Sequence, residues 1–366
     1  MATTEKPRVV AIDAMRGLVM TGLVLVTPFI PAIASLPEGA VRDSLVAQLN
    51  HSPWHGLTKA DVTFGLFVML LGTMIPVSLG RRVADGTSLV RTYGQVLRRS
   101  VLLFALGVFY NGGFSQPWPE IRWAGILQRL AVLYLVGALV YLNCPRWVRY
   151  AAAPVLLLGY WALLATVPAP GGTAGDYTFN GNLAAWVDAQ ALPGRAYFGT
   201  WDPEGILTTL PALASCFLGM MWADLLSSGV RPAKQVFYLW IAAIVAIDLG
   251  FVWSEAFPIN KSLWTSPYAL VVAGVGCVLL GICQWIAEVW RRPAWLFPLV
   301  VVGRNLLMAF LLPNVIRLGP LVDRIVGGDV AKMLGAFAPW VAGLVEAGLI
   351  WLFLYWLYQK RIVVKL

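Results

Sequence analysis

The chain has two histidines, His51 and His55, and both fall in the short segment Asn50-His51-Ser52-Pro53-Trp54-His55-Gly56. Histidine is the side chain whose unperturbed pKa lies near neutrality, so it suits proton transfer and acyl transfer. A carboxylate, Asp61, follows at the mouth of a predicted membrane span and could orient one imidazole. This pattern indicates acid–base or nucleophilic chemistry. A solvated loop at the lipid interface, with Trp54 as an anchor, would give the same pattern.

Ionisable side chains also occur inside predicted membrane spans. Arg129 ends the run Gly125-Ile126-Leu127-Gln128-Arg129, and Arg304 lies within Gly303-Arg304-Asn305. A charge at the centre of a membrane costs roughly 3 kcal/mol or more, so such residues usually face a cavity and form pairs. Each motif places an amide beside a guanidinium, which suits a ligand with phosphate or carbonyl groups. The alternative is a structural ion pair, for example between Arg304 and Glu346.

Four arginines bracket one predicted inner loop, namely Arg81, Arg82, Arg98 and Arg99. They lie near one another if the spans on either side of the loop pack as a hairpin. The cluster could then bind the phosphates of a cofactor that enters from the cytosol. The alternative is that these arginines only anchor the inner ends of the spans.

Two carboxylates, Asp202 and Glu204, lie in the predicted outer segment Trp201-Asp202-Pro203-Glu204-Gly205. An Asp-Pro pair before a helix is typical of an N-cap followed by a first-turn proline, and Glu204 would then favour the helix dipole. The functional alternative is that a carboxylate here binds a cationic or hydroxyl-rich substrate.

Composition predicts the elements that must position these residues. Of the 366 residues, 59% are hydrophobic and 12% are charged, and the mean hydropathy is +0.73. Soluble domains carry about 25% charged residues, and a spanning helix needs about 20 apolar residues. We therefore predict an all-α, polytopic membrane helix bundle that forms one domain over residues 1–366. About ten spans are expected, at roughly 15–34, 62–80, 100–112, 123–142, 150–168, 205–226, 235–254, 266–287, 296–314 and 337–358.

The distribution of charge predicts the orientation. The net charge of +9 could suggest a nucleic-acid partner. However, Lys and Arg gather in short loops on alternate sides of the spans, as the positive-inside rule describes. We therefore expect cytoplasmic termini, no nucleic acid, and large outer loops at 35–61 and 169–204. The polar N-terminal segment lacks a small-residue cleavage site, so the first span is expected to be retained. The four cysteines show no metal spacing, and no metal is expected.

Several blocks of the chain, taken together and in order, resemble the heparan-α-glucosaminide N-acetyltransferase family. Its bacterial inner-membrane members are associated with amino-sugar metabolism. The matching blocks cover most of the chain and are His51–Phe64, Gly72–Leu79, Asn111–Gly113, Ile121–Arg129, Asp202–Pro211, Ile259–Ser266 and Gly303–Asn305.

The resemblance implies a transmembrane acetyltransferase in a bacterial inner membrane. Such an enzyme takes acetyl from cytosolic acetyl-CoA, its co-substrate, and delivers it to the amine of a glucosamine unit on the periplasmic side. The family's active-site histidine falls on His51, so the expected catalytic residues are His51, Asp61 and Asn50. The expected acetyl-CoA residues are Arg81, Arg82, Arg98, Arg99, Gln128, Arg129, Arg304 and Asn305. The expected acceptor-binding residues are Trp54, His55, Asn111, Asp202, Glu204, Asn260, Lys261 and Trp264.

The expected partners are an amino-sugar or glycan acceptor and the lipid bilayer, with a homodimer left open. Two other functions also stay open from sequence. A transporter of an amino sugar or of N-acetylglucosamine could use the same outer aromatic side chains without acyl transfer. An acyltransferase could use another donor or acceptor, such as a cell-wall polymer. Sequence does not separate an acetyl-histidine intermediate from direct transfer, nor does it say whether transport accompanies transfer.

Overall fold

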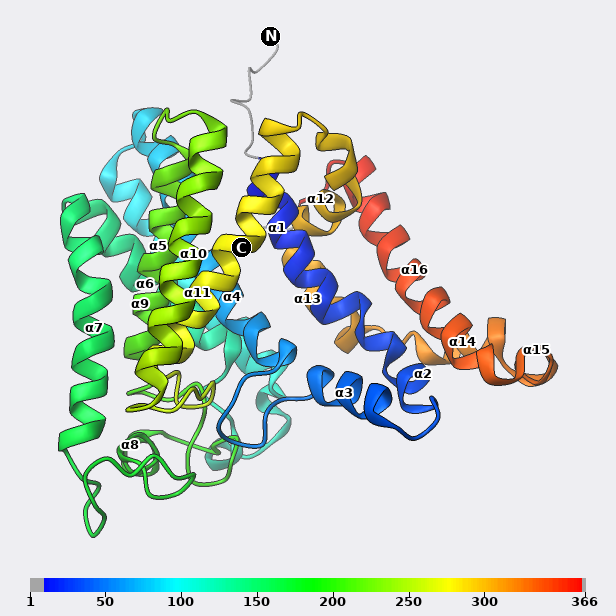
Figure 1. The fold of residues 1–366 in the computed structure, drawn as a ribbon, viewed down its shortest axis with the longest axis horizontal. Coiled ribbons are helices and arrows are strands. Elements are labelled where there is room, and N and C mark those ends of the chain that lie inside the picture. Colours follow the sequence, from blue (N-terminus) through cyan, green and yellow to red (C-terminus); the bar gives the residue numbers. More distant parts are fainter. Residues whose placement is uncertain (1–9, 364–366) are drawn as a thin grey trace.

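The computed structural model describes residues 10–363 and shows an all-α molecule (Figure 1). The predicted fold class is confirmed. Within the described residues, eight helices are long and apolar enough to cross a membrane, or nine if one bent pair counts as a single span. The expectation about the polar N-terminal segment concerns residues 1–9, which lie outside this range.

The long helices match predicted spans, with boundaries that shift by a few residues. The first span is α1 (Val10–Met20) with its continuation through α2 (Ile30–Ala34), and the last is α15 (Gly328–Leu334) with α16 (Ala338–Gln359). The others are α4 (Lys59–Ala84), α6 (Ile126–Asn143), α7 (Arg146–Thr166), α9 (Thr209–Leu226), α10 (Pro232–Ser254) and α11 (Ser266–Gln284), which a π-helical turn extends to Val289.

Two of the ten expected spans differ from the prediction. The expected short span at 100–112 is part of a longer helix, α5 (Leu89–Tyr110), whose first half carries three arginines, and α5 is not among the eight candidate spans. The expected span at 296–314 is broken. Its two halves, α12 (Phe297–Arg304) and α13 (Leu306–Val315), bend by 65° at Asn305.

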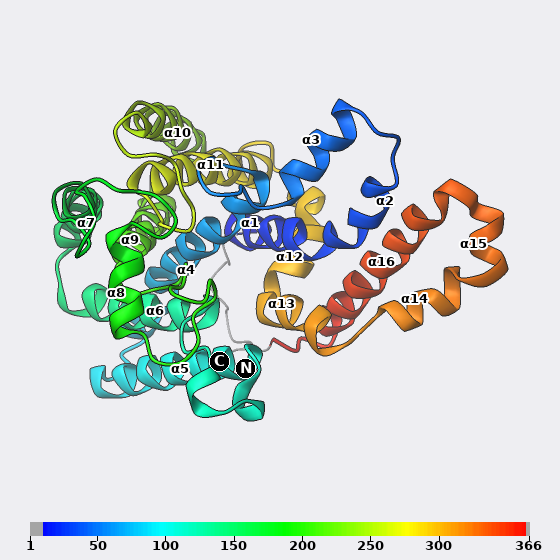
Figure 2. The same ribbon diagram turned by 90° about the horizontal axis from the view of Figure 1, so that it is seen from below.

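Helix α1 lies between two groups of helices (Figures 1 and 2). On one side, buried residues of α1 join the main apolar core with α4, α6, α7, α9 and α11. On the other side, Met20 joins a second core with α12, α13 and α16. Glycines let α1 and α12 approach closely, because a Cβ on Gly17 would lie 1.8 Å from the Leu299 carbonyl oxygen. The two groups of helices therefore pack against a shared central helix.

The two large loops lie at the same end of the bundle, which we call the loop end. It carries α3 (Ala40–Leu49) and α8 (Leu183–Ala191), and it is the lower end in Figure 1. The start of α1 and the end of α16 lie at the opposite end. The start of the first span and the end of the last are therefore on one side, while the assignment of that side to the cytoplasm stays a prediction.

Helices α4 and α9 also meet through glycines. A Cβ on Gly72 would lie 1.9 Å from the carbonyl oxygen of Cys216, and one on Gly219 would lie 1.9 Å from that of Met69. In lipid, close backbone approach of this kind supplies much of the van der Waals attraction between helices. The position of α4 therefore depends on these glycines. This helix carries Asp61 in its first turn and Arg81 and Arg82 in its last.

We predict that Gly72→Ala destabilises the bundle, because the added methyl group pushes α4 away from the α9 backbone. Overpacking of this kind costs about 1–3 kcal/mol, so the thermal unfolding midpoint in detergent should fall by several degrees. The matched control is Gly159→Ala on α7, where a Cβ meets nothing within 4 Å. An equal midpoint in the two variants would contradict this account of the α4–α9 contact.

Candidate active site

Asp61 organises the loop end from the first turn of α4. Its side chain is 1% exposed, and its Oδ2 accepts hydrogen bonds from the backbone N–H groups of Ser52 and Thr58, each at 3.1 Å. The Thr58 hydroxyl also bonds Oδ2 at 3.0 Å, and Thr58 accepts the N–H of Asp61 in a capping box. These bonds fold the loop back onto the start of α4.

The same carboxylate holds His51. Oδ1 of Asp61 lies 2.8 Å from Nδ1 of His51, and the His51 side chain is 60% exposed. Because an ionised carboxylate can only accept, this geometry places a proton on Nδ1, and in the neutral imidazole the lone pair is then on Nε2. The arrangement orients the imidazole as a base or nucleophile, as in the generalised triad.

A lysine from the α10–α11 loop reaches this pair. Nζ of Lys261 lies 3.2 Å from each ring nitrogen of His51 and 4.0 Å from Oδ1 of Asp61. Burial lowers the pKa of Lys261, while the charges of Asp61 and Glu204 act to raise it. Lys261 was expected to bind the acceptor, and the structure places its ammonium group against His51.

Asn260 joins the loop of the histidines to the α10–α11 loop. Its Nδ2 donates to the Trp54 carbonyl at 2.9 Å and lies 3.3 Å from Nδ1 of His55, while its Oδ1 accepts the N–H of Leu263. Burial lowers the pKa of His55. Asn50, expected to assist catalysis, uses its amide to bond the Val46 carbonyl at the end of α3. These contacts hold the segment 50–56 in place around His51.

The expected aromatic residues have different surroundings. Trp54 is half-buried, packs against Phe179 and Trp201, and donates through Nε1 to the Tyr177 carbonyl. It therefore fixes the 169–204 loop beside the histidines. Trp264 is 1% exposed and packs against Phe64, so its ring offers no surface on which a sugar could stack in this structure.

Asp202 and Glu204 form a buried network with Arg122, which the sequence analysis did not single out. Arg122 bonds both oxygens of Asp202, at 2.7 and 2.8 Å, and Oε2 of Glu204 at 2.7 Å. Burial raises the pKa of Asp202, but the hydrogen bond and charge of Arg122 outweigh it, and the net shift is downward. Burial and Asp202 raise the pKa of Glu204. The N-cap reading is wrong, because α9 begins only at Thr209.

A third buried carboxylate supports the same segment. Asp188 on α8 accepts the N–H groups of Asp202 at 3.3 Å and Ile206 at 2.9 Å, and burial raises its pKa to about 6. Asp188 was also missed, because nothing in the sequence links α8 to residues 202–206. Loss of these bonds would release the turn that holds Asp202.

Arg129 and Gln128 lie beneath this network. Arg129 is 3% exposed, donates through Nη2 to the Pro203 carbonyl at 2.7 Å, and also bonds the Thr208 hydroxyl. Gln128 donates a long hydrogen bond of 3.4 Å to the Arg122 carbonyl. Asn111 donates a bond of the same length to the Ala124 carbonyl. These three side chains support the backbone of the loop end in this structure, and their predicted binding roles are untested.

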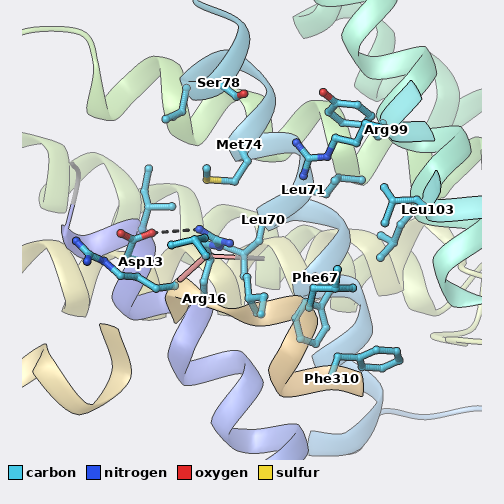
Figure 3. A pocket seen from close by; sticks show the side chains of 18 of the residues that line it. Asp13, Arg16, Phe67, Leu70, Leu71, Met74, Ser78, Arg99, Leu103 and Phe310 are labelled. Carbon is cyan, nitrogen blue, oxygen red and sulfur yellow. Dashed lines mark hydrogen bonds and ion pairs between the residues drawn. The ribbon is translucent and has the colours of Figure 1, made fainter. Parts of the chain in front are cut away.

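A cavity of about 730 Å³ lies between α1, α4, α5, α6 and α12–α13 (Figure 3). It brings together five of the eight residues expected to bind acetyl-CoA, namely Arg81, Arg82, Arg98, Arg99 and Arg304. Gln128, Arg129 and Asn305 do not line it. Small-molecule sites typically enclose about 300–1,000 Å³, so the cavity has the size of a cofactor site.

The cavity follows one face of α4. Its lining from that helix runs from Arg81 and Arg82 to Phe67 with helical spacing, which at about 1.5 Å per residue covers roughly 20 Å. The far end is apolar and includes Phe67, Leu103 and Phe310, labelled in Figure 3. Asp61 lies about 9 Å further along the helix axis. The cavity thus runs from a basic end toward the loop end, and neither Asp61 nor His51 lines it.

Two of the cavity arginines keep an unused donor. Arg99 lies over the ring of Tyr134 at 4.5 Å and Arg304 over that of Tyr358 at 4.8 Å. In both, Nε is buried without a hydrogen-bond partner among the described residues. The described ion pairs do not join Arg304 to Glu346, so the structural pair considered above is not formed. Buried N–H groups normally have partners, which suits these two positions to an anionic ligand.

The cavity also contains an acid–base pair that sequence reasoning missed. Asp13 and Arg16 on α1 line it and are joined at 3.1 Å (Figure 3). The sequence does contain a signal for this pair, because residues three apart lie on the same face of a helix and can form an ion pair. Across residues 10–363, no group of three or more His, Cys, Asp or Glu side chains is placed to hold a metal ion.

We find no protein-family model that matches the chain. Curated proteins do match it. The human heparan-α-glucosaminide N-acetyltransferase is 26% identical over an alignment of 366 positions that covers 83% of this chain and 52% of the relative. The mouse protein of the same name is 27% identical over 325 residues, which cover 70% of this chain and 49% of the relative. The chain spans about half the length of these relatives and is a distant homologue of heparan-α-glucosaminide N-acetyltransferase.

Proposed function

We propose that this protein is a transmembrane acetyltransferase that moves acetyl from cytosolic acetyl-CoA to the amine of a glucosamine-type sugar on the opposite side of the membrane. The observation that carries the proposal is the two-ended arrangement along α4. An arginine-lined cavity occupies one end, and the His51–Asp61 pair occupies the other. The distant homology to an N-acetyltransferase agrees with it.

The basic end of the cavity suits the anionic part of the donor. Guanidinium groups bind phosphates through charge-assisted hydrogen bonds, and Arg81, Arg82, Arg98 and Arg99 supply several around one space. The apolar end suits the uncharged pantetheine arm and its thioester. A molecule bound in this direction would point its acetyl group toward the loop end.

At the loop end, the lone pair on Nε2 of His51 allows two routes. In the first, Nε2 removes a proton from the sugar ammonium, and the free amine attacks the thioester carbonyl; the C–S bond breaks, and the departing CoA thiolate takes the proton from Nε2. In the second, Nε2 attacks the thioester carbonyl and expels the CoA thiolate; the sugar amine, once it has lost a proton to solvent, attacks the acetyl-imidazole, and the bond between the acetyl carbon and Nε2 breaks to free His51. In both routes Asp61 stabilises the imidazole by accepting from Nδ1.

The proposal includes topology and setting. The whole chain acts as one transmembrane acyltransferase domain in a bacterial inner membrane, with the loop end in the periplasm and the basic end in the cytosol. The network of Arg122, Asp202 and Glu204 stabilises the outer wall of the acceptor site, beside Trp54 and Asn260. An amino-sugar transporter is the main alternative, and it differs by not requiring acetyl-CoA.

We predict that His51→Ala abolishes acetyl transfer in proteoliposomes that hold glucosamine on the loop-end side and acetyl-CoA on the other. Loss of a general base or nucleophile costs at least about 100-fold in rate. The control is binding of acetyl-CoA to the same variant, which should stay unchanged because the cavity does not include His51. Wild-type turnover by His51→Ala would refute the catalytic role, and sugar uptake without acetyl-CoA would favour a transporter.

We predict that Arg82→Gln and Arg99→Gln each weaken acetyl-CoA binding about tenfold or more, because each removes a charge-assisted hydrogen bond worth about 1.5–3 kcal/mol. Calorimetric titration with acetyl-CoA measures the effect. The matched control is Arg91→Gln, which removes an exposed arginine of α5 outside the cavity lining. Equal affinities in all three variants would place the donor elsewhere.

A further inference from the structure

Lys261 stands in an unusual position relative to His51. Its Nζ is equally far, 3.2 Å, from both ring nitrogens. An atom in line with the Nε2 lone pair would lie much farther from Nδ1, so Lys261 does not occupy that lone pair. The ammonium group lies against the ring and leaves Nε2 accessible.

The cluster holds one carboxylate and two bases. Asp61 lies 2.8 Å from His51 and 4.0 Å from Lys261, so it faces both. The reference pKa of lysine exceeds that of histidine by about four units. Because Lys261 and His51 share this one carboxylate and lie against each other, a positive charge on Lys261 disfavours a second positive charge on His51.

We propose that Lys261 is a positioning residue whose charge keeps His51 neutral, so that Nε2 retains its lone pair while Asp61 serves both side chains. This inference rests on the proposed function for the reaction that His51 carries out. It gives Lys261 a role toward His51 rather than toward the sugar.

The other charged and titratable groups around the cluster come from three directions. His55 lies in the same loop as His51 and contacts Asn260. Glu204, from the segment before α9, acts to keep Lys261 protonated, while Arg129 of α6 opposes it. Burial also opposes the charge on Lys261. Asp61 is the group nearest to Lys261 that favours its ammonium form, so the two side chains depend on each other.

The test reads the protonation of His51 without any acetyl transfer. In a His55→Gln background, His51 is the one remaining histidine, and diethyl pyrocarbonate modifies the neutral imidazole. The rate of His51 modification is followed by peptide mass spectrometry from pH 5 to pH 8 in that background, with Lys261 intact or replaced by Met, Gln or Arg.

Without the lysine charge, Asp61 draws a proton to His51. We expect the midpoint of the pH dependence to rise by about one unit or more in Lys261→Met and Lys261→Gln. Lys261→Arg should keep a midpoint close to that of the background. The matched control, Lys59→Met, removes an exposed lysine near Asp61 and should leave the midpoint unchanged.

An unchanged or lower midpoint in both Lys261→Met and Lys261→Gln would overturn the proposal, as would an equal rise in Lys59→Met. Two neutral variants are used so that a folding defect in one does not decide the result. Because the probe needs neither acetyl-CoA nor sugar, the midpoint shift tests Lys261 even if the protein transfers no acetyl group. Failure of acetyl transfer in the wild-type protein would instead overturn the proposed function.

Discussion

One buried carboxylate, Asp61, organises the segment of the loop end that carries His51. A carboxylate in a protein interior is tolerated only when its oxygens are well bonded, and here the loop supplies the donors: two backbone N–H groups, the Thr58 hydroxyl and His51. The need to satisfy Asp61 therefore bends residues 51–58 into one conformation. The result is that an exposed imidazole, which would otherwise be mobile, has a fixed orientation and a fixed tautomer.

Helix α4 converts this local constraint into a relation across the membrane. Its first turn holds Asp61 and its last turn holds Arg81 and Arg82, about 30 Å away at 1.5 Å per residue. That is the thickness of the hydrocarbon core. The glycine contacts with α9 set the lateral position of α4 in the bundle. One face of α4 lines the cavity. A single helix thus sets the distance between the proposed donor and acceptor sites.

The parts of this arrangement that are local in sequence were predictable. His51 and Asp61 are ten residues apart, so their spacing indicated that the imidazole and the carboxylate would lie close together. The arginines at 81–82 and 98–99 lie on either side of one short turn, so their spacing indicated that the four guanidinium groups would gather at one site. The contacts that depend on tertiary packing were not. Lys261 approaches His51 from 210 residues away, and Arg122 reaches Asp202 and Glu204 across 80 and 82 residues. Sequence assigned Trp264 to acceptor binding because it lies in a predicted outer loop, whereas tertiary packing against Phe64 buries its ring.

The distance between the cavity and His51 has a physical consequence for the proposed reaction. The cavity reaches the start of α6 at Ile126 and Leu127, but neither His51 nor Asp61 lines it, and its deepest position on α4, Phe67, is about 9 Å short of Asp61. A donor held by the arginines must therefore bring its thioester through a layer of apolar side chains such as Phe67 and Phe310. Side chains in that layer, rather than the anchored imidazole, have to move for acetyl to pass, because His51 is fixed by the bonds that keep Asp61 buried.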